Sequence, residues 1–225
     1  MKKKFWFAAL LVIALLLIDQ CIKIYVKSNL SPGVPNPLLG NWFLIRYIEN
    51  PGMAFGTTLG ASGYAKIALS IFRLIAIGVI AVYIVREIKK GLKFPALIAL
   101  SMVFAGATGN LIDSMFYDFI FPFDPCFPYN EMEGSGVIEK CQGKNSITAF
   151  HEVRNHGFMY GNVVDMFHFQ AYWPESMPWV GGKEVFPAIF NFADACITIG
   201  ISLLILIHRK SIFSWSKKQE SDNKA

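Results

Sequence analysis

The sequence predicts a mainly α-helical membrane protein with four transmembrane helices, a small extracytoplasmic β element and an extracytoplasmic insertion. Hydrophobic residues make up 54% of the 225 residues and charged residues 16%, so the chain is far more apolar than a soluble domain. Four apolar runs are each long enough for a hydrocarbon core of about 30 Å, which takes about 20 helical residues. Lysine and arginine gather beside these runs, so the net charge of +5 indicates membrane topology and no nucleic-acid partner.

The four runs predict transmembrane helices within one polytopic domain that spans residues 1–225. The first run follows the basic stretch "MKKK", as in a signal peptide, but "IDQC" lacks the small residues of a cleavage site, so we expect a retained helix. The third and fourth runs open with Phe-Pro, which suits a first helical turn because the missing N–H would have no helical partner there. We expect the helices at about residues 5–26, 64–86, 94–115 and 186–208.

Basic residues mark the N-terminus, the connection between the second and third helices, and the segment after the fourth helix. The positive-inside rule therefore places both termini in the cytoplasm. Residues 27–63 and 116–162 then lie on the extracytoplasmic side. The first segment contains "NWFLIRYIENPGMAFG", which predicts a strand and a turn at the membrane surface. The second has scattered proline and glycine and no helical period, and it is either a compact insertion or a mobile loop.

Three aspartates fall in the predicted helices at similar depth. At about 1.5 Å per residue, Asp19 lies about 21 Å above the inner end of its helix and Asp113 about 28 Å above. Asp194 lies about 12 Å below the outer end of the fourth helix. Asp165, in "NVVDMFHF", precedes that helix and can reach the same level. We therefore expect these carboxylates to converge in the outer half of the membrane.

A carboxylate at the centre of a membrane costs about 2.5 to 3.5 kcal/mol, so this group indicates a function. Polar residues also join packed helices, but that role leaves the carboxylates with Lys23 as the only obvious cation beside them. Close carboxyls in a low dielectric share a proton, which gives a general acid and a general base and predicts an aspartic hydrolase. A proton or cation transporter is the alternative, but few polar side chains beyond Ser70 and Arg73 are expected in the inner halves of the helices.

Two of the aspartates have an asparagine three residues earlier, in "NLID" and "NFAD". Residues three apart share a face of a helix, so Asn110 would lie beside Asp113 and Asn191 beside Asp194. An asparagine amide donates hydrogen bonds to a carboxylate or to a substrate carbonyl. Both asparagines are therefore expected in the site.

Five motifs occur in the order and topological positions of the bacterial lipoprotein signal peptidase family, or signal peptidase II: "IDQCIK", "NPGMAFG", "AGATGNLID", "VVDMFHF" and "FPAIFNFADACITIG". The chain resembles this family over nearly its whole length. The resemblance implies an aspartic endopeptidase that cleaves the signal peptide from diacylglyceryl-modified prolipoproteins on the amino side of the lipidated cysteine. Asp165 and Asp194 would be the catalytic pair. The residues that would shape the site and hold the substrate are Asp19, Asn50, Gly52, Ala54, Phe55, Asn110, Asp113 and Asn191.

The same resemblance implies a multi-pass protein of the bacterial cytoplasmic (inner) membrane with its active site near the outer face. It implies no metal or organic cofactor, contact with membrane phospholipid, inhibition by globomycin-type cyclic peptides, and a monomer. The alternative is a non-enzymatic polytopic membrane transporter or lipid-binding protein on the same scaffold.

Two features depart from the family pattern. The usual arginine after "GNLID" is Ser114 here, and Arg154, Lys144 and Arg46 are candidates to replace it. The segment between "GNLID" and "VVD" is also much longer than the usual link. It covers the site as a lid, recognises part of the lipoprotein or is a surface elaboration without a catalytic part.

Two cysteines, Cys126 and Cys141, fall in this insertion, where a disulfide is chemically permitted. With His151 and His156 they also form a C-x14-C-x9-H-x4-H set, whose spacing is poor for zinc. Zinc is the weaker of the two interpretations, and the sequence leaves open whether Cys126 and Cys141 form a disulfide.

Overall fold

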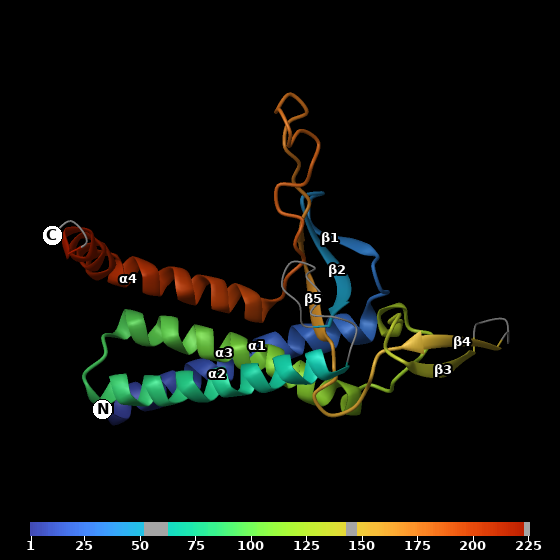
Figure 1. Cartoon of the computed structure of the whole chain (residues 1–225), viewed down its shortest axis with the longest axis horizontal. Coiled ribbons are helices and arrows are strands. Elements are labelled where there is room, and N and C mark those ends of the chain that lie inside the picture. The colour runs from blue at the N-terminus through green and yellow to red at the C-terminus, as the bar shows by residue number, and fades with distance from the viewer. Residues whose placement is uncertain (52–62, 143–147, 223–225) are drawn as a thin grey trace.

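Four long helices and two small antiparallel sheets make up the computed structural model of the chain, which describes residues 1–51, 63–142 and 148–222 (Figure 1). The site residues predicted at Gly52, Ala54 and Phe55 lie outside these ranges. The elements in chain order are α1 (Lys2–Asn29), β1 (Pro35–Leu39), β2 (Phe43–Asn50), α2 (Gly63–Lys89), α3 (Phe94–Ile120), the short 3-10 helix η1 (Pro128–Asn130), β3 (Val137–Gln142), β4 (Thr148–Val153), β5 (Val163–Phe169) and α4 (Phe192–Asp222).

The helix α3 is the centre of the bundle, because α1, α2 and α4 each pack more extensively against α3 than against one another. Two glycines let its neighbours come close. A Cβ atom at Gly106 would overlap the backbone carbonyl of Ala193 in α4, and one at Gly109 would lie 2.6 Å from a carboxylate oxygen of Asp19. Small residues serve membrane helices in this way, since close packing and hydrogen bonds, rather than exclusion of water, hold such helices together.

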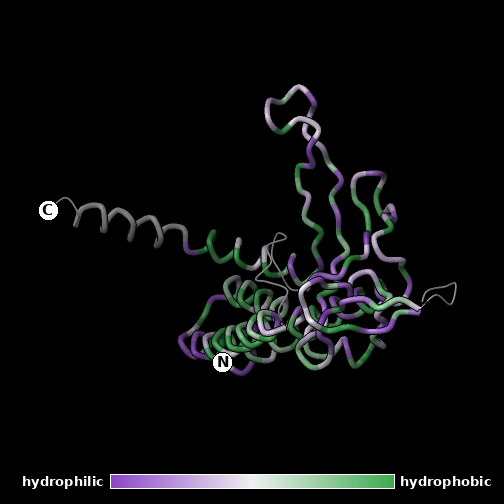
Figure 2. The backbone as a smooth tube through the Cα atoms, turned by 45° about the vertical axis from the view of Figure 1, so that its right-hand side comes forward, coloured by the Kyte–Doolittle hydropathy of each residue, from purple (hydrophilic) through white to green (hydrophobic). Residues whose placement is uncertain are grey.

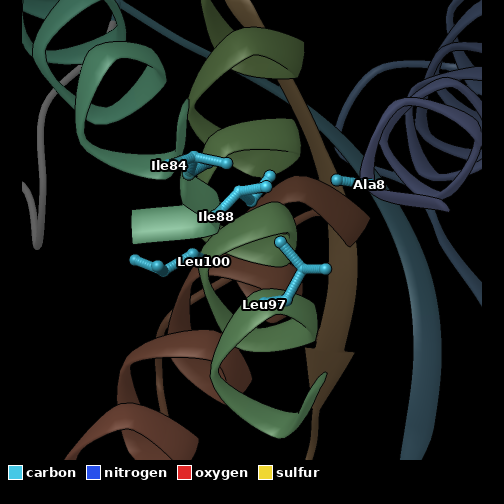
Figure 3. Close-up of a cluster of buried hydrophobic side chains, with 5 residues drawn as sticks. All are labelled: Ala8, Ile84, Ile88, Leu97 and Leu100. Atoms are coloured by element: carbon cyan, nitrogen blue, oxygen red, sulfur yellow. The ribbon is translucent and has the colours of Figure 1, made fainter. Parts of the chain in front are cut away.

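An apolar cluster joins α1, α2 and α3 at the end of the bundle away from the three-stranded sheet. Figure 3 shows its buried members, which are Ala8, Ile84, Ile88, Leu97 and Leu100. At the same end, Lys4 donates a hydrogen bond of 2.6 Å to the carbonyl of Leu92. The basic N-terminus and the basic α2–α3 connection therefore lie together, and the C-terminal end of α4 lies at this end too (Figure 1).

The outer surface of the bundle is apolar (Figure 2). Among the described residues, α1, α2 and α3 are long and apolar enough to cross a membrane, whereas the apolar part of α4, Phe192–His208, is shorter. Large apolar side chains are exposed along α1 and α2, among them Leu10, Leu17, Phe72, Ile75 and Val79. Such a surface fits contact with lipid rather than water. The protein is a membrane protein, and a fourth span through α4 stays a prediction.

The three-stranded sheet, in the order β1-β2-β5, stands at the other end of the bundle with its strands crosswise to the helices (Figure 1). Both pairings are antiparallel. Because side chains alternate across a strand, β5 has two faces. Val164 and Met166 are buried in the apolar cluster beneath the sheet. The alternation places Asp165, Phe167 and Phe169 on the other face of β5, where the half-buried Phe167 also packs against the edge of the cluster.

The insertion contains a hairpin of β3 and β4, and a disulfide joins Cys126 to Cys141. The two cysteines are thus linked to each other, and His151 pairs with Glu131. The structure thus settles the pairing that the sequence left open. The hairpin is also regular secondary structure that the scattered glycine and proline did not predict.

The base of the insertion is anchored to α3, which runs to Ile120 rather than to about residue 115. The two Nη atoms of Arg154 each donate a 2.8 Å hydrogen bond to the carboxylate of Asp118, and its Nε donates one of 2.8 Å to Asn130. The insertion is therefore compact in its described part. Its β3–β4 hairpin extends beyond the helices along their direction (Figure 1), away from the sheet.

The helix α4 begins at Phe192, later than the Phe-Pro start predicted near residue 186. The chain before it is extended, because the N–H of Phe190 donates to Phe167 at 3.0 Å and its carbonyl accepts from Phe167 at 2.7 Å. Asn191 then caps the helix. Its Oδ1 accepts a 2.9 Å hydrogen bond from the N–H of Asp194, while its own N–H donates to Asp194 Oδ2 at 3.2 Å. This reciprocal pair is a capping box, and it starts the helix at residue 192.

We expect Gly106→Ala to destabilise the protein, because the new methyl group would push α3 and α4 apart. Overpacking of a tight interface costs about 1 to 3 kcal/mol, which thermal unfolding in detergent micelles would show as a lower midpoint. Gly78→Ala is the matched control, since Gly78 is also helical and a Cβ atom there meets nothing within 4 Å. Alanine favours a helix over glycine, so the control should be neutral or slightly stabilising. Equal midpoints would contradict the close α3–α4 contact.

Candidate active site

Four aspartates gather at the end of the bundle that carries the three-stranded sheet. Asp19 comes from α1, Asp113 from α3, Asp165 from β5 and Asp194 from the first turn of α4. Their side chains form two groups: the first two bind a lysine, and the last two are held by asparagines. The convergence that helix depth predicts is therefore present.

The first group is an ion network of Lys23, Asp19, Asp113 and Gln20. Lys23 Nζ lies 3.0 Å from Asp19 Oδ2 and 2.8 Å from Asp113 Oδ2, and all three charged side chains are almost fully buried. Gln20 Nε2 donates to the same two carboxylates at 3.1 and 3.0 Å. Buried charges persist only when they are paired and hydrogen-bonded, and here the network supplies both.

The remaining bonds of the ion network position the elements that carry the second group. Asp19 Oδ1 accepts a 3.0 Å hydrogen bond from the N–H of Ala193, one of the first N–H groups of α4, which have no partner within the helix. Asp113 Oδ2 accepts one of 3.3 Å from the N–H of Val164 in β5. Asp19 and Asp113 are thus buried supports of α4 and β5.

The second group, which we call the aspartate pair, is Asp165 and Asp194. Asn191 joins them: its Nδ2 donates a 2.6 Å hydrogen bond to Asp165 Oδ1, and its N–H donates to Asp194 Oδ2. Asn50, at the end of β2, donates to Asp165 Oδ2 at 3.1 Å. Because the chain just before α4 pairs with β5, the residue that opens the helix lies beside the aspartate of the strand.

Asn110 of α3 connects the ion network to the aspartate pair. Its Oδ1 accepts hydrogen bonds from Lys23 Nζ at 2.8 Å and from Asn191 Nδ2 at 3.1 Å. Its Nδ2 donates to Asp194 Oδ1 at 2.8 Å. An asparagine amide offers both an acceptor and donors, and Asn110 uses both. The contact with the aspartate pair is therefore made by a neutral amide and not by the ammonium group.

Asp165 and Asp194 have different surroundings. Asp165 is buried on β5, and this burial, followed by the negative charge of Asp194, raises the pKa of Asp165 to about 7 against the opposing effect of nearby donors. Asp194 is partly exposed at the start of α4. A pair in which one carboxyl keeps its proton near neutral pH has the arrangement of a general acid beside a general base.

Positive charge reaches the site from α2. Arg73 Nη1 donates a 3.4 Å hydrogen bond to Oγ of Ser114, the residue that stands where the family pattern has arginine. The guanidinium charge also interacts with the carboxylates of Asp194, Asp113 and Asp165. The sequence analysis missed both Gln20 and Arg73 as site residues. The signal of Arg73 is a charge within an otherwise apolar helix.

The candidates proposed to replace the family arginine are placed elsewhere. Arg154 holds the insertion, Arg46 donates to a backbone carbonyl at 2.9 Å, and Lys144 lies outside the described residues. The prediction that Arg73 lies in the inner half of its helix was wrong. Since α2 starts at Gly63, near the sheet, residue 73 belongs to the half of the helix that faces the aspartates.

A family model of signal peptidase (SPase) II matches residues 11–209. The chain belongs to the signal peptidase II family. The lipoprotein signal peptidase of Porphyromonas gingivalis is 37% identical over 214 residues, which cover 91% of this chain and 83% of the relative. That of Amoebophilus asiaticus is 33% identical over 229 residues, which cover 98% and 85%. The family resemblance seen in the five motifs is thereby confirmed.

Solved structures share the fold of this signal peptidase II family member. A bacterial membrane enzyme determined by the in meso method at 2.3 Å resolution superposes with a TM-score of 0.55 and 21% sequence identity. The match covers 92% of this chain and 89% of that chain. At this identity the likeness supports the arrangement of helices and sheet and says nothing of individual site residues.

We expect Lys23→Met to destabilise the signal peptidase II fold by about 3 to 5 kcal/mol, because two buried carboxylates lose their cation. Thermal unfolding in detergent measures the loss. Lys90→Met, which removes an exposed ion pair with Glu87, is the matched control and should change stability little. Adding Asp113→Asn to Lys23→Met should recover part of the loss, since one unpaired charge disappears. If Lys23→Met unfolded at the midpoint of the control, the ion network would not be the support described here.

Proposed function

We propose that this member of the signal peptidase II family is an aspartic endopeptidase that uses Asp165 and Asp194 to remove the signal peptide from diacylglyceryl-modified prolipoproteins. The observation that carries the proposal is the aspartate pair, held by Asn191 and differing in exposure. The relatives are named lipoprotein signal peptidases, which supports the substrate class. Membership of a peptidase family disfavours the alternative of a transporter or lipid-binding protein.

In the proposed mechanism, the more exposed carboxylate of Asp194 accepts a proton from a water molecule. The water oxygen attacks the scissile carbonyl carbon on the amino side of the lipidated cysteine, and protonated Asp165 hydrogen-bonds the developing oxyanion. As the C–N bond breaks, the leaving amine takes a proton from the pair. The raised pKa of Asp165 supports this division, because the carboxyl still carries its proton near neutral pH.

The substrate would approach along the aromatic face of β5. Phe167 and Phe169 share that face with Asp165, and Phe43 of β2 stacks against both rings at 5.7 and 4.8 Å between centroids. The proposed protein crosses the bacterial inner membrane with both termini in the cytoplasm and the aspartate pair near the outer face. The diacylglyceryl chains then stay in the bilayer while the peptide crosses the sheet, and membrane embedding orients the scissile bond.

Two further properties belong to the proposal. The protein acts as a monomer and is inhibited by globomycin-type cyclic peptides, both as the family resemblance implies. The β3–β4 hairpin takes no part in the mechanism, because it extends away from the sheet (Figure 1). The proposed mechanism therefore does not use the described part of the insertion as a lid over the site.

We expect Asp165→Asn and Asp194→Asn each to lower the cleavage rate of a diacylglyceryl prolipoprotein in detergent by about 10² to 10⁴-fold, the typical contribution of a general acid or base. Both changes keep side-chain size, so the thermal unfolding midpoint should stay within the range of a folded protein. Asp124→Asn is the matched control, because Asp124 is exposed in the insertion and accepts a hydrogen bond from the N–H of Cys126. It should cleave normally. Normal cleavage by Asp165→Asn or Asp194→Asn would remove that residue from the catalytic pair.

The pH dependence of kcat/KM should reveal the proton on Asp165. This carboxyl holds its proton below about pH 7 and loses it above, so cleavage should fall as the pH rises through about 7. Asn50→Ala removes a donor that favours the ionised form, so the pKa should rise and the alkaline limb should move to higher pH. Asn36→Ala, which removes a partly exposed amide from β1, is the control and should leave the limb in place. An alkaline limb that Asn50→Ala does not move would contradict the assignment.

A further inference from the structure

A hairpin-like segment continues the three-stranded sheet beyond β5. Residues 170–186, which we call the aromatic arm, leave the sheet and return toward α4. The two sides of the arm are joined by backbone hydrogen bonds, from Val185 N–H to Ala171 at 2.7 Å and from Trp173 N–H to Lys183 at 2.9 Å. Its base is tied to the sheet by His168, which lies 3.4 Å from Glu184. The arm is therefore a defined extension of the sheet.

The aromatic arm exposes large apolar side chains along its length. They are Tyr172, Trp173, Met177, Trp179, Val180, Val185 and Phe186. Trp179, at the tip, is 92% exposed. Exposed apolar surface of this extent marks contact with a partner or a membrane. The three charges of the arm, two acidic and one basic, are too few to indicate a charged partner.

The direction of the arm favours contact with the membrane over contact with a partner protein. Both views show the arm projecting sideways from the bundle, crosswise to α1, α2 and α3 (Figures 1 and 2). When those helices stand along the bilayer normal, the arm runs parallel to the bilayer surface, at the level of the helix ends next to the sheet. Tryptophan and tyrosine concentrate at this level in membrane proteins, because their rings are apolar and carry one polar group.

We propose that the aromatic arm lies in the headgroup region of the outer leaflet, with Trp173, Met177 and Trp179 inserted toward the acyl chains. The proposal uses the membrane orientation given under the proposed function, but not the cleavage chemistry. Apolar contact drives the binding, so zwitterionic phosphatidylcholine suffices. The arm continues from β5, and its contact with lipid sets the height of Asp165 relative to the bilayer.

Tryptophan fluorescence tests this placement directly. Phenylalanine replaces Trp6, Trp42, Trp173 and Trp215, which leaves Trp179 as the only tryptophan of the full chain. The protein is placed in phosphatidylcholine nanodiscs, where both faces of the membrane are accessible to solutes. We expect emission at shorter wavelength than in water, weak quenching by iodide, and strong quenching by lipids brominated near the headgroup end of the acyl chain. Lipids brominated near the chain end should quench less.

The β3–β4 hairpin offers a matched control. Phe150 is 73% exposed on the same side of the membrane, but its hairpin extends along the helix direction, away from the bilayer. In a variant with Phe150→Trp as the only tryptophan, the emission wavelength should match that of tryptophan in water. Iodide should quench this emission strongly, and brominated lipids should not quench it. The contrast between the two positions separates lipid contact from simple exposure on the outer side.

The proposal is overturned if Trp179 behaves like the tryptophan at position 150. It is also overturned if Trp179 becomes protected from iodide only when a second protein is added, because the arm would then bind that protein. Cleavage of a diacylglyceryl prolipoprotein is measured on the same nanodiscs. If the protein cleaves the prolipoprotein while Trp179 stays in water, only the proposed lipid contact of the arm is contradicted. If brominated lipids quench Trp179 but no cleavage occurs, only the proposed peptidase function is contradicted.

Discussion

The Lys23 ammonium group lies between the carboxylates of Asp19 and Asp113, and the elements that carry the aspartate pair are arranged around these three charges. In a membrane protein such a group is costly unless every charge is paired, so its geometry tolerates little change. The two carboxylates use their remaining bonding capacity on backbone N–H groups outside α1 and α3. One holds the start of α4 at Ala193 and the other holds β5 at Val164. The ion network thus joins the helix and the strand that carry the aspartate pair.

Asparagine side chains separate the ion network from the aspartate pair, and this separation has a chemical consequence. A lysine in direct contact with Asp165 would favour its ionised form and remove the proton that an acid needs. Asn110 instead binds Lys23 on one side and Asp194 on the other. The ion network therefore positions Asp194 through a neutral amide. Burial and the neighbouring carboxylate then dominate, and they raise the pKa of Asp165 to about 7.

Sequence reasoning found the residues whose signal is local and missed those whose role depends on distant partners. Apolar run length predicted α1, α2 and α3, and counting rise per residue brought Asp19 and Asp113 to one level. The start of α4 was predicted too early, because Phe186-Pro187 was taken as the first helical turn. The spacing of "NFAD" was taken as two residues on one helix face, although it also describes a capping box. Arg73 was misplaced because its depth was not counted from the end of α2 near the sheet. The disulfide was only one permitted outcome, since spacing along the chain does not fix distance in space.

The two members of the aspartate pair owe their difference to the secondary structure that carries each of them. Asp194 stands in the first turn of α4, where N–H groups point outward and the helix dipole favours negative charge. Asp165 stands on a buried strand, whose neighbouring dipoles largely cancel. A helix start beside a strand therefore gives the two carboxyls different surroundings without any difference in side-chain type. The pairing of Phe190 with Phe167 holds the two elements in register, so the asymmetry persists only while that short stretch of sheet stays intact.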